Sequence, residues 1–398
     1  MLHFADLHLG VESHSRPDPA TGLSTRVGDF LERLDEVVDY ALNEKADLVV
    51  FAGDAFHKRD PNPTLLREFA RRIKRLADEV PTLLLVGNHD APGIASRANS
   101  IDIFGALDVP GVILGNRPEG QIVETSSGPV YLAWLPYPMR NRLLSNRDNQ
   151  GKSIEELELA LREAVTAIVK DLARQADEHD MPRVLAGHFT VDQAVFGSER
   201  AVMIGRDVAV NLDVLADPAW DYVALGHIHK HQVLSEQPPV VYSGSLERID
   251  FGEQEEEKGF CWVELEHGKT SWSFVPVQAR EFVTIRIDTT AAEIDDPTES
   301  FLEMLPELAF DEAVVRIIFT MRPDQSPALN DREIQASLPN VSSLSIIREI
   351  EEEARTRLGD LAVETLTPLQ LLETYFQSKD MSPDRIEVLV ERAEELLL

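Results

Sequence analysis

The sequence predicts a layered α/β fold, and three observations support that class. Short apolar runs recur along the chain, and each stops at a polar cluster, as buried strands do. Helical patterns lie between the runs, so strands and helices alternate as they do when helices cover a sheet. A length of 398 residues allows one large domain and one or two small modules.

The apolar runs are the expected strands of the large domain. They occupy residues 47 to 52, 82 to 86, 183 to 186 and 221 to 225. Apolar residues at helical spacing fill segments between them, at residues 28 to 43, 63 to 79 and 154 to 178. In such folds ligands gather at the carboxyl ends of the strands, which makes the polar clusters there candidates for a functional site.

The pattern changes after about residue 280. Strand-like segments at 282 to 288, 313 to 320 and 341 to 348 alternate with helix-like segments at 297 to 307 and 331 to 337, which predicts a small α+β module. Residues 349 to 364 are charged and weakly patterned, and two short amphipathic helices follow. We therefore expect a main domain at 1–280, an α+β capping domain at 281–348, and a linker with a helix-loop-helix at 349–398.

Composition limits the class of protein. No stretch approaches the roughly 18 to 20 apolar residues that span a bilayer, and the first residues do not form a secretory leader. Cys261 is the only cysteine, which excludes an intrachain disulfide and fits a reducing compartment. These features predict a cytoplasmic protein with no membrane partner.

The charge of the chain bears on nucleic-acid binding. A formal net charge of −32 opposes simple binding, because phosphate affinity normally comes from excess Lys and Arg. A local basic rim, bound metal ions or a partner protein would each resolve that conflict.

Polar side chains collect at the ends of the predicted strands. Six histidines stand there with two aspartates and an asparagine: His8, His57, His89, His188, His227, His229, Asp6, Asp54 and Asn88. This mixture of imidazole and oxygen ligands suits Mn, Fe or Zn better than Mg or Ca. A loop rich in Asn and His gains little from packing, so the sequence predicts a metal centre.

A pair of metal ions needs one ligand that bridges them. Asp54 follows a central predicted strand, and its carboxylate has two oxygens, so it is the candidate bridge. Two divalent ions about 3.5 to 4 Å apart can clamp a phosphate. With Asp6 and Asp54 as the only anionic ligands, the ions keep a net positive charge that favours an anionic substrate. These residues indicate phosphate ester hydrolysis.

The other histidines have weaker claims. We expect His3 to lie in the first strand, and we assign no role to His14, His179 or His267, which have no strand-end context. His231 is two residues beyond His229 and is a candidate for orienting a ligand.

The polar clusters and their order resemble those of the calcineurin-like metallophosphoesterase superfamily. The motifs that carry the resemblance are Asp6-Leu7-His8, Gly53-Asp54, Gly87-Asn88-His89-Asp90, Gly187-His188 and Gly226-His227-Ile228-His229. Within the superfamily, residues 6 to 10, 53 to 57 and 242 to 248 are similar to those of the SbcD nucleases, bacterial counterparts of the meiotic-recombination nuclease. The likeness covers about residues 1 to 265 and implies a metallophosphoesterase β-sandwich flanked by helices. Ala55 replaces the family's usual bulkier residue, and fewer residues precede the first strand, but neither departure removes a ligand.

The resemblance implies a role for each motif residue. One metal would be held by Asp6, His8, Asp54 and His229, and the other by Asp54, Asn88, His188 and His227. His89 would be the catalytic histidine beside the scissile phosphate, with Asp90 as its orienter, and His57 would position the phosphate. The cofactors would be two divalent metal ions, with Mn as the expected metal.

The resemblance also implies an activity and partners. The chain would be the nuclease subunit of an SbcCD-like repair complex, a homodimer with an SbcC-type coiled-coil ABC ATPase. It would cut DNA ends and hairpins as an exonuclease and endonuclease. Two alternatives stay open: a phosphatase or small-molecule phosphodiesterase, which shares every metal ligand, and a scaffold without catalysis. The complete ligand set weighs against the scaffold, and the 242 to 248 motif favours the nuclease.

Three further features are candidates for contacts with partners. Basic residues near the motifs either line the DNA path or are ordinary surface charges: Arg26, Lys58, Arg59, Arg97, Arg140, Arg142 and Arg248. The apolar stripe of the helix at 63 to 79 either packs on the sheet or joins residues 96 to 107 in a two-fold interface. The last two helices carry apolar stripes that either pack within the chain or grip the coiled coil of the ATPase.

Overall fold

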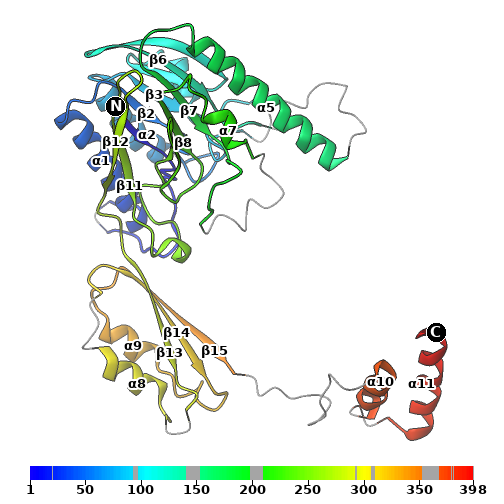
Figure 1. The fold of residues 1–398 in the computed structure, drawn as a ribbon. Helices are drawn as coiled ribbons and strands as arrows, with labels where there is room; N and C mark the ends of the chain where they lie inside the picture. Colours follow the sequence, from blue (N-terminus) through cyan, green and yellow to red (C-terminus); the bar gives the residue numbers. More distant parts are fainter. Residues whose placement is uncertain are drawn as a thin grey trace. The chain divides into compact units, whose positions relative to one another are not determined.

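The computed structural model describes residues 1–19, 21–92, 97–139, 153–197, 209–291, 294–305, 310–351, 367–377, 379 and 381–397. The chain divides into two compact units (Figure 1). The first comprises Met1–Ile285, Ala309–Arg316 and Leu338–Ser345, and the second comprises Arg286–Leu308, Ile317–Ser337 and Ile346–Leu398. A search of the described helices finds none whose length and apolar character suit a bilayer crossing.

Two six-stranded sheets form the centre of the first unit. The first sheet has the order β12-β11-β1-β2-β3-β4. Its strands are β1 (Leu2–Phe4), β2 (Val49–Phe51), β3 (Thr82–Leu85), β4 (Val112–Gly115), β11 (Gly259–Glu264) and β12 (Ser271–Pro276). Strands β1 to β4 run parallel, whereas β11 pairs antiparallel with both β1 and β12.

The second sheet has the order β5-β6-β7-β8-β10-β9. Its strands are β5 (Glu119–Thr125), β6 (Gly128–Leu135), β7 (Arg183–His188), β8 (Tyr222–Gly226), β9 (Gln232–Glu236) and β10 (Pro239–Tyr242). The central strands β6, β7, β8 and β10 run parallel, and antiparallel hairpins close both edges. The four strands expected from the apolar runs are present as β2, β3, β7 and β8.

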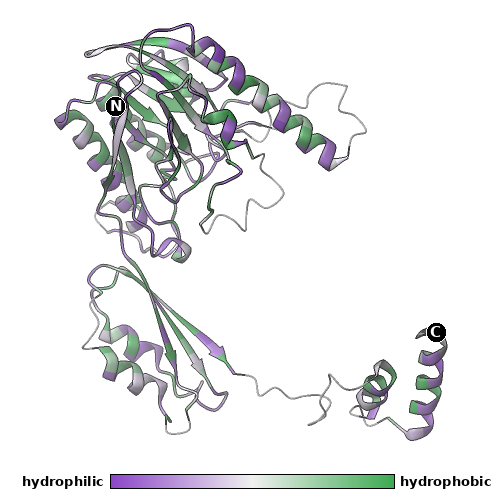
Figure 2. Cartoon of the chain, in the orientation of Figure 1, coloured by the Kyte–Doolittle hydropathy of each residue, from purple (hydrophilic) through white to green (hydrophobic). Residues whose placement is uncertain are grey.

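Helices cover the outer face of each sheet (Figure 1). They are α1 (Thr25–Asn43), α2 (Pro63–Ala77), α3 (Asp102–Ala106), α5 (Ile154–Ala176) and α7 (Leu212–Leu215), and a 3₁₀ turn lies at Phe251–Glu253. Apolar residues of α1 and α2 share a core with the first sheet, and those of α5 and α7 share one with the second. The coloured ribbon in Figure 2 shows hydrophobic segments concentrated in the strands.

Alternation along the strands produces the layers. In β2, Val49 and Phe51 belong to the core beneath α1 and α2, while Val50 belongs to the core between the two sheets. Successive residues of a strand point to opposite faces, so a strand that is apolar throughout needs cover on both sides. The result is a helix-sheet-sheet-helix sandwich, which confirms the layered α/β class and the β-sandwich flanked by helices that the resemblance implied.

Helix α2 shows how local sequence and packing agree. The Asn62 side chain accepts hydrogen bonds from the backbone N–H groups of Thr64 and Leu65 at 2.9 and 3.1 Å, which caps the first turn. The apolar stripe is buried in the core of the first unit: Leu65, Phe69, Ile73 and Leu76. This stripe therefore packs on the sheet, which was one of the two alternatives that the sequence left open.

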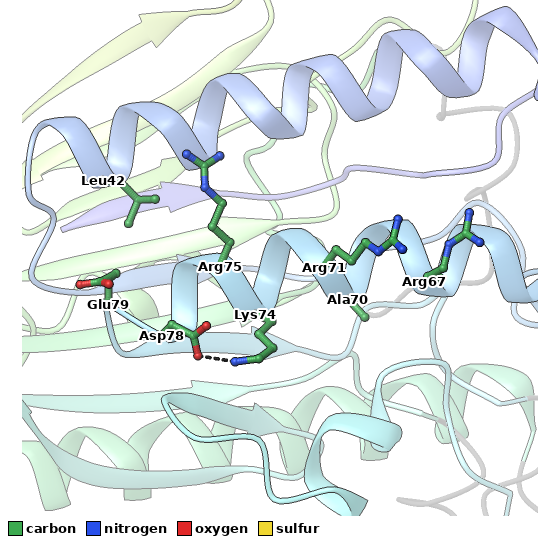
Figure 3. Close-up of a pocket in the computed structure, with 8 residues that line it drawn as sticks. All are labelled: Leu42, Arg67, Ala70, Arg71, Lys74, Arg75, Asp78 and Glu79. Atoms are coloured by element: carbon green, nitrogen blue, oxygen red, sulfur yellow. Dashed lines mark hydrogen bonds and ion pairs between the residues drawn. The ribbon is translucent and has the colours of Figure 1, made fainter. Parts of the chain in front are cut away.

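The outer face of α2 is basic and solvent-exposed. It lines a surface pocket whose residues are Leu42, Arg67, Ala70, Arg71, Lys74, Arg75, Asp78 and Glu79 (Figure 3). Acidic neighbours pair with these cations, for example Asp78 with Lys74 and Asp39 with Arg75. None of the lining residues is a candidate metal ligand.

The α+β module has all five elements expected after residue 280. They are β13 (Phe282–Asp288), α8 (Pro297–Met304), β14 (Val314–Met321), α9 (Asp331–Ser337) and β15 (Ser343–Ile350), and the strands form one sheet in the order β13-β14-β15. Phe301 of α8 and Phe319 of β14 are fully buried, with ring centroids 6.4 Å apart. Their contact joins helix to sheet.

Two helices lie at the end of the chain, α10 (Pro368–Gln377) and α11 (Pro383–Leu397), and they contact each other. A capping box begins α10: Gln370 Oε1 accepts from the Thr367 N–H at 2.9 Å, and Thr367 Oγ1 accepts from the Gln370 N–H at 3.4 Å. Most of the expected linker, residues 352 to 366, lies outside the described residues.

Candidate metal centre

The carboxyl ends of five parallel strands meet at one edge of the sandwich. Strands β1, β2 and β3 come from the first sheet, and β7 and β8 from the second. The residues at these ends are Asp6 and His8 after β1, Asp54 after β2, Asn88 and His89 after β3, His188 in β7, and His227 and His229 after β8. Ligand atoms of Asp6, His8 and His229 lie within 4.8 Å of one another, and so do those of Asp6, Asp54 and His188.

Four of the candidate ligands have a left-handed backbone. The angle φ is 52° at Asp6, 47° at His8, 60° at Asp54 and 101° at His227. Only four other non-glycine residues in the described ranges have positive φ. The left-handed region is unfavourable for residues other than glycine and costs about 1–3 kcal/mol each, so the surrounding structure must hold it. Strain gathered in one place is typical of a functional site.

Two glycines allow the strand ends to approach closely. A Cβ at Gly87 would lie 2.1 Å from Asp54 Oδ1, and a Cβ at Gly53 would lie 2.4 Å from His188 Nδ1. Gly53 also has a φ of 101°. A larger residue at Gly87 would displace Asp54, and one at Gly53 would displace His188.

Asp54 lies between histidines from the two sheets. Its Oδ2 is 3.6 Å from His8 Nε2 and 3.4 Å from His188 Nε2. Its Oδ1 accepts a hydrogen bond from the His89 backbone N–H at 2.8 Å. The carboxylate is almost fully buried and faces imidazole nitrogen on both sides, which is the geometry that a bridging ligand needs.

The other candidate ligands form two groups beside Asp54. Asn88 Oδ1 is 3.0 Å from His188 Nε2 and 2.8 Å from His227 Nδ1. On the other side, His8 Nε2 and His229 Nε2 are 3.0 Å apart. Ring nitrogens and amide oxygen thus converge at two neighbouring points.

Hydrogen bonds fix which ring nitrogen faces the centre. His188 Nδ1 is 2.7 Å from the Ala52 carbonyl oxygen, which can only accept, so Nδ1–H donates there and Nε2 is turned toward the candidate site. His229 Nδ1 is 2.8 Å from Glu253 Oε1, with the same consequence. Both histidines therefore direct Nε2 toward the candidate site.

Burial and charge set the protonation states. Burial alone would raise the pKa of Asp54, but the neighbouring imidazoles, His188 first, outweigh it and hold the pKa well below its ordinary value. Burial opposes a charge on His188, yet the Asp54 carboxylate prevails and raises the His188 pKa to about 9. Burial lowers the pKa of His8 well below its ordinary value, and the charges of His229 and His89 add to that effect. The pocket thus keeps Asp54 anionic and draws positive charge to its side.

The donor set fits divalent metal ions. Asp6 and Asp54 bring carboxylates into an interior where they are 0% and 2% exposed, which is costly unless cations balance them. Imidazole nitrogens and an amide oxygen complete a set of mixed hardness. The structure therefore brings the expected ligand atoms together.

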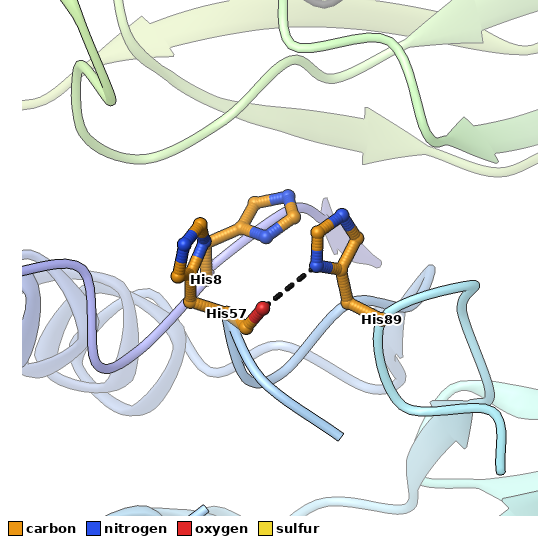
Figure 4. Close-up of side chains that lie close together, drawn as sticks. All are labelled: His8, His57 and His89. Carbon is orange, nitrogen blue, oxygen red and sulfur yellow. Dashed lines mark hydrogen bonds between the residues drawn. The ribbon is translucent and has the colours of Figure 1, made fainter. Parts of the chain in front are cut away.

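His89 stands beside this cluster with one ring nitrogen occupied (Figure 4). Its Nδ1 is 2.8 Å from the His57 carbonyl oxygen, so Nδ1–H donates and Nε2 is left without that proton. The rings of His57 and His89 stack with centroids 5.8 Å apart, and the His8 ring meets the His89 ring edge-on at 4.7 Å. The structure thus brings both expected catalytic histidines to the centre.

The interpretation of Asp90 needs correction. Asp90 oxygens accept hydrogen bonds from the backbone N–H groups of Asp54, Ala55 and Gly87 at 3.0 to 3.2 Å, and from Ser100 Oγ at 3.1 Å. The oxygen that receives the His89 ring proton belongs to His57 instead. Asp90 therefore holds the loop that carries Asp54, and burial together with the Asp54 charge raises its pKa to about 6.

Sequence reasoning missed two residues beside His229. Glu253, in the 3₁₀ turn, and Lys258 are both fully buried side chains and form an ion pair at 2.8 Å. Burial would raise the pKa of Glu253, but Lys258 and His229 outweigh it and lower the pKa well below its ordinary value. No motif marks Glu253 in the acidic run from 253 to 257, so only a fold that brings it to His229 reveals it.

Two of the basic residues weighed as DNA contacts or surface charges are bonded within the first unit, one of them fully buried and the other half-buried. Arg26 is fully buried, where it pairs with Asp29 at 2.8 Å and donates to the Arg248 carbonyl. Arg248 donates to the carbonyls of Arg280 and Glu256 at 2.9 Å each. Both alternatives were wrong for Arg26, because charge in a sequence does not reveal burial. Lys58, Arg59 and Arg97 are exposed, and Arg140 and Arg142 lie outside the described residues.

The remaining histidines have structural surroundings. His3 lies in β1, 3.2 Å from both Tyr222 Oη and the Leu225 carbonyl oxygen, and burial lowers its pKa to about 3. His231 Nδ1 donates to the Tyr242 carbonyl at 2.8 Å, and its ring stacks on Phe274. These contacts give His231 a packing role and show no bond to a ligand.

Comparisons with known proteins agree with this geometry. A family model described as Calcineurin-like phosphoesterase matches residues 1–231, more than half of the chain. The SbcD component of the SbcCD nuclease of Bacillus subtilis is 28% identical over 294 residues, which are 69% of this chain and 68% of that protein. The corresponding SbcD protein of Escherichia coli K12 is 24% identical over 392 residues, 94% of this chain and 91% of that protein. DNA double-strand break repair protein Mre11 of Archaeoglobus fulgidus is 24% identical over 331 residues, and although these are 76% of this chain, they span only 64% of that protein.

Proposed function

The chain belongs to the calcineurin-like phosphoesterase family, and from that premise we propose that it is a two-metal phosphodiesterase that cleaves DNA in strand-break repair. The observation that carries the proposal is the convergence of candidate ligands from both sheets on Asp54. Relatives named as components of a nuclease and as a double-strand break repair protein supply the substrate class. An electropositive pair of ions attracts a phosphodiester.

The ligands divide between two metal positions. In the proposal one position uses Asp6, His8, Asp54 and His229, and the other uses Asp54, Asn88, His188 and His227. When bound, divalent ions orient the phosphate, neutralise its charge and make water a stronger nucleophile. Mn is the proposed metal, because the ligand set mixes imidazole with hard oxygen.

His89 is the proposed catalytic residue of the chain itself. Its Nδ1–H is committed to the His57 carbonyl, so Nε2 is the atom available to the scissile phosphate or its leaving oxygen. A protonated Nε2 donates a hydrogen bond there as negative charge develops, and transfers the proton as the P–O bond breaks. His57 supports the ring through its carbonyl and by stacking, and its own ring is near enough to help position the phosphate.

The strong negative charge of the chain favours a further source of positive charge for DNA binding. At −32, the surface as a whole repels phosphates, so metal ions and partner proteins would supply the attraction. We propose a homodimer that works in the cytoplasm with an SbcC-type coiled-coil ABC ATPase. The proposed parts are a nuclease domain at 1–280, a capping domain at 281–348 and a linker with the ATPase-binding helices at 349–398.

The test is a nuclease assay on end-labelled duplex DNA with Mn, Mg or chelator, each with and without the ATPase. We expect cleavage with Mn, none with chelator, and stimulation by the ATPase with ATP. A protein that holds two metals and hydrolyses a chromogenic phosphodiester but leaves DNA intact would be the small-molecule enzyme. A pure protein that binds no metal would be the silent scaffold.

A further inference from the structure

A buried ion pair stands directly behind one candidate ligand. Glu253 Oε1 accepts a hydrogen bond from His229 Nδ1 at 2.8 Å, and Glu253 Oε2 is 2.8 Å from Lys258 Nζ. The side chains of Glu253 and Lys258 are 0% exposed. We propose that this pair positions His229 and sets the metal affinity of the site that His229 serves; the inference rests on the proposed two-metal function.

Lys258 makes more contacts than it would need only to neutralise the charge of Glu253. Its Nζ contacts Glu253 Oε2 and Glu256 Oε2 at 2.8 Å each, and it donates to the His229 carbonyl at 3.3 Å. An ammonium has three N–H donors, and these contacts employ all of them. Lys258 therefore holds His229 twice, by its backbone directly and by its ring through Glu253.

The backbone around His229 is held by the loop that follows β10. The Ser245 N–H donates to the His229 carbonyl at 2.9 Å, and the Ile249 N–H donates to Glu253 Oε2 at 3.1 Å. These residues belong to or border the segment 242 to 248, which resembles the nuclease motif. This segment, with Ile249 beside it, therefore has a structural role, because its backbone N–H groups hold His229 and Glu253 in place.

Charge distinguishes His229 from three other histidines whose Nδ1 has a fixed partner. His188, His89 and His231 direct Nδ1 to backbone carbonyls, of Ala52, His57 and Tyr242. His229 instead faces a carboxylate, which strengthens the electron donation of the opposite nitrogen as well as fixing the tautomer. Nε2 of His229 is the atom that meets His8 at 3.0 Å, so this effect is directed into the candidate site.

The decisive variant is Glu253→Gln in the full-length chain. Its amide oxygen can still accept from His229, but the negative charge is lost. Metal binding would be followed by competition of Mn with a chromogenic chelator, and by the absorption spectrum of the Co form. We expect one of the two binding events to weaken by about 10- to 100-fold, the usual effect of losing such a partner, with the other unchanged. The Co spectrum should change for that ion alone.

The matched control is Glu256→Gln. This change also removes a carboxylate partner from Lys258, but Glu256 is not bonded to the His229 ring, so both metal affinities should stay at wild-type values. Glu253→Asp is the conservative variant: it keeps the charge while drawing the carboxylate back, and it should restore affinity only in part. If Glu253→Gln leaves Lys258 unpaired and the protein unfolds, the double variant Glu253→Gln/Lys258→Met removes the stranded charge and gives the same comparison.

The outcomes separate this inference from the proposed function. Wild-type affinity for both ions in folded Glu253→Gln or in the double variant would overturn the positioning role while leaving the nuclease proposal intact. A wild-type chain that binds no pair of divalent ions would overturn the proposed function itself. Equal weakening in Glu253→Gln and Glu256→Gln would show that loss of lysine pairing, and not the His229 contact, is responsible.

Discussion

The metal centre and the C-terminal helix pair differ in how far their side chains are buried and bonded within the chain. At the centre, buried groups are satisfied within the chain: Asp90 accepts several backbone N–H groups, and Asp54 is flanked by imidazoles. In α10 and α11, Ile386 is buried, but Tyr375 is 40% and Val388 is 63% exposed. The candidate ligands therefore depend on contacts within the first unit, whereas the helix pair keeps exposed apolar side chains, which the proposed contact with the ATPase would need.

Asp54→Ala should break the centre most completely. One substitution removes the group that faces both His8 and His188, so we expect both metals to be lost. Removing a single charge-stabilising donor commonly costs about 10²–10³ in rate, and loss of a two-ion clamp should exceed that. Metal analysis of the purified variant and a DNA cleavage assay check this. Full occupancy of both metals would show that another residue is the bridge.

His89→Asn should separate binding from catalysis. The amide can still donate to the His57 carbonyl, and His89 is not among the proposed ligands, so metals and DNA should bind normally. Turnover should fall by about 10²–10⁴-fold, the usual contribution of a general acid or base. Cleavage rates beside metal content and a DNA-binding titration give the comparison. Loss of metal from this variant would count against the assigned role.

Asp90→Asn should affect stability more than mechanism. Its amide would present a donor where backbone N–H groups now find an acceptor, and each unsatisfied buried donor costs about 1–3 kcal/mol. Chemical denaturation measures the free energy of unfolding. Ser100→Ala is the control, because it removes one hydroxyl partner of Asp90 and should cost only about 0.5–1.5 kcal/mol. Equal stabilities of Asp90→Asn and the wild type would contradict this view of Asp90.

Deletion of residues 365–398 should have the smallest effect on the centre. We expect metal content and Mn-dependent cleavage of single-stranded DNA to stay near wild type, because no ligand lies in these residues. Co-purification with the ATPase and ATP-stimulated activity should be lost. A pull-down with the ATPase, run beside the cleavage assay, tests both halves. A truncated protein that binds the ATPase with unchanged affinity would contradict the proposal that the helix pair binds the ATPase.

Sequence patterns were informative where an apolar run of strand length is followed directly by polar side chains. The apolar runs before Asp54, Asn88 and His188 correctly predicted strands, and strand ends correctly predicted where polar side chains would meet. Contacts made by backbone atoms leave no such pattern. The sequence therefore did not show that Asp90 accepts hydrogen bonds from the Asp54 loop and is not the partner of the His89 ring. Glu253 was missed because its partner His229 is distant in the chain and its acidic neighbours look like ordinary surface charge.

The order of the ligands along the chain has a consequence for synthesis. Asp6 and His8 leave the ribosome first, yet the centre also needs His188, His227 and His229 from the second sheet. A nascent chain that has made only β1 to β4 would carry the loops of Asp6, His8, Asp54 and Asn88 without the histidines that follow β7 and β8. In the proposed function, hydrolysis would therefore begin only after residues through His229 have been made and the two sheets have packed together, and an unfinished polypeptide would leave the surrounding nucleic acids intact.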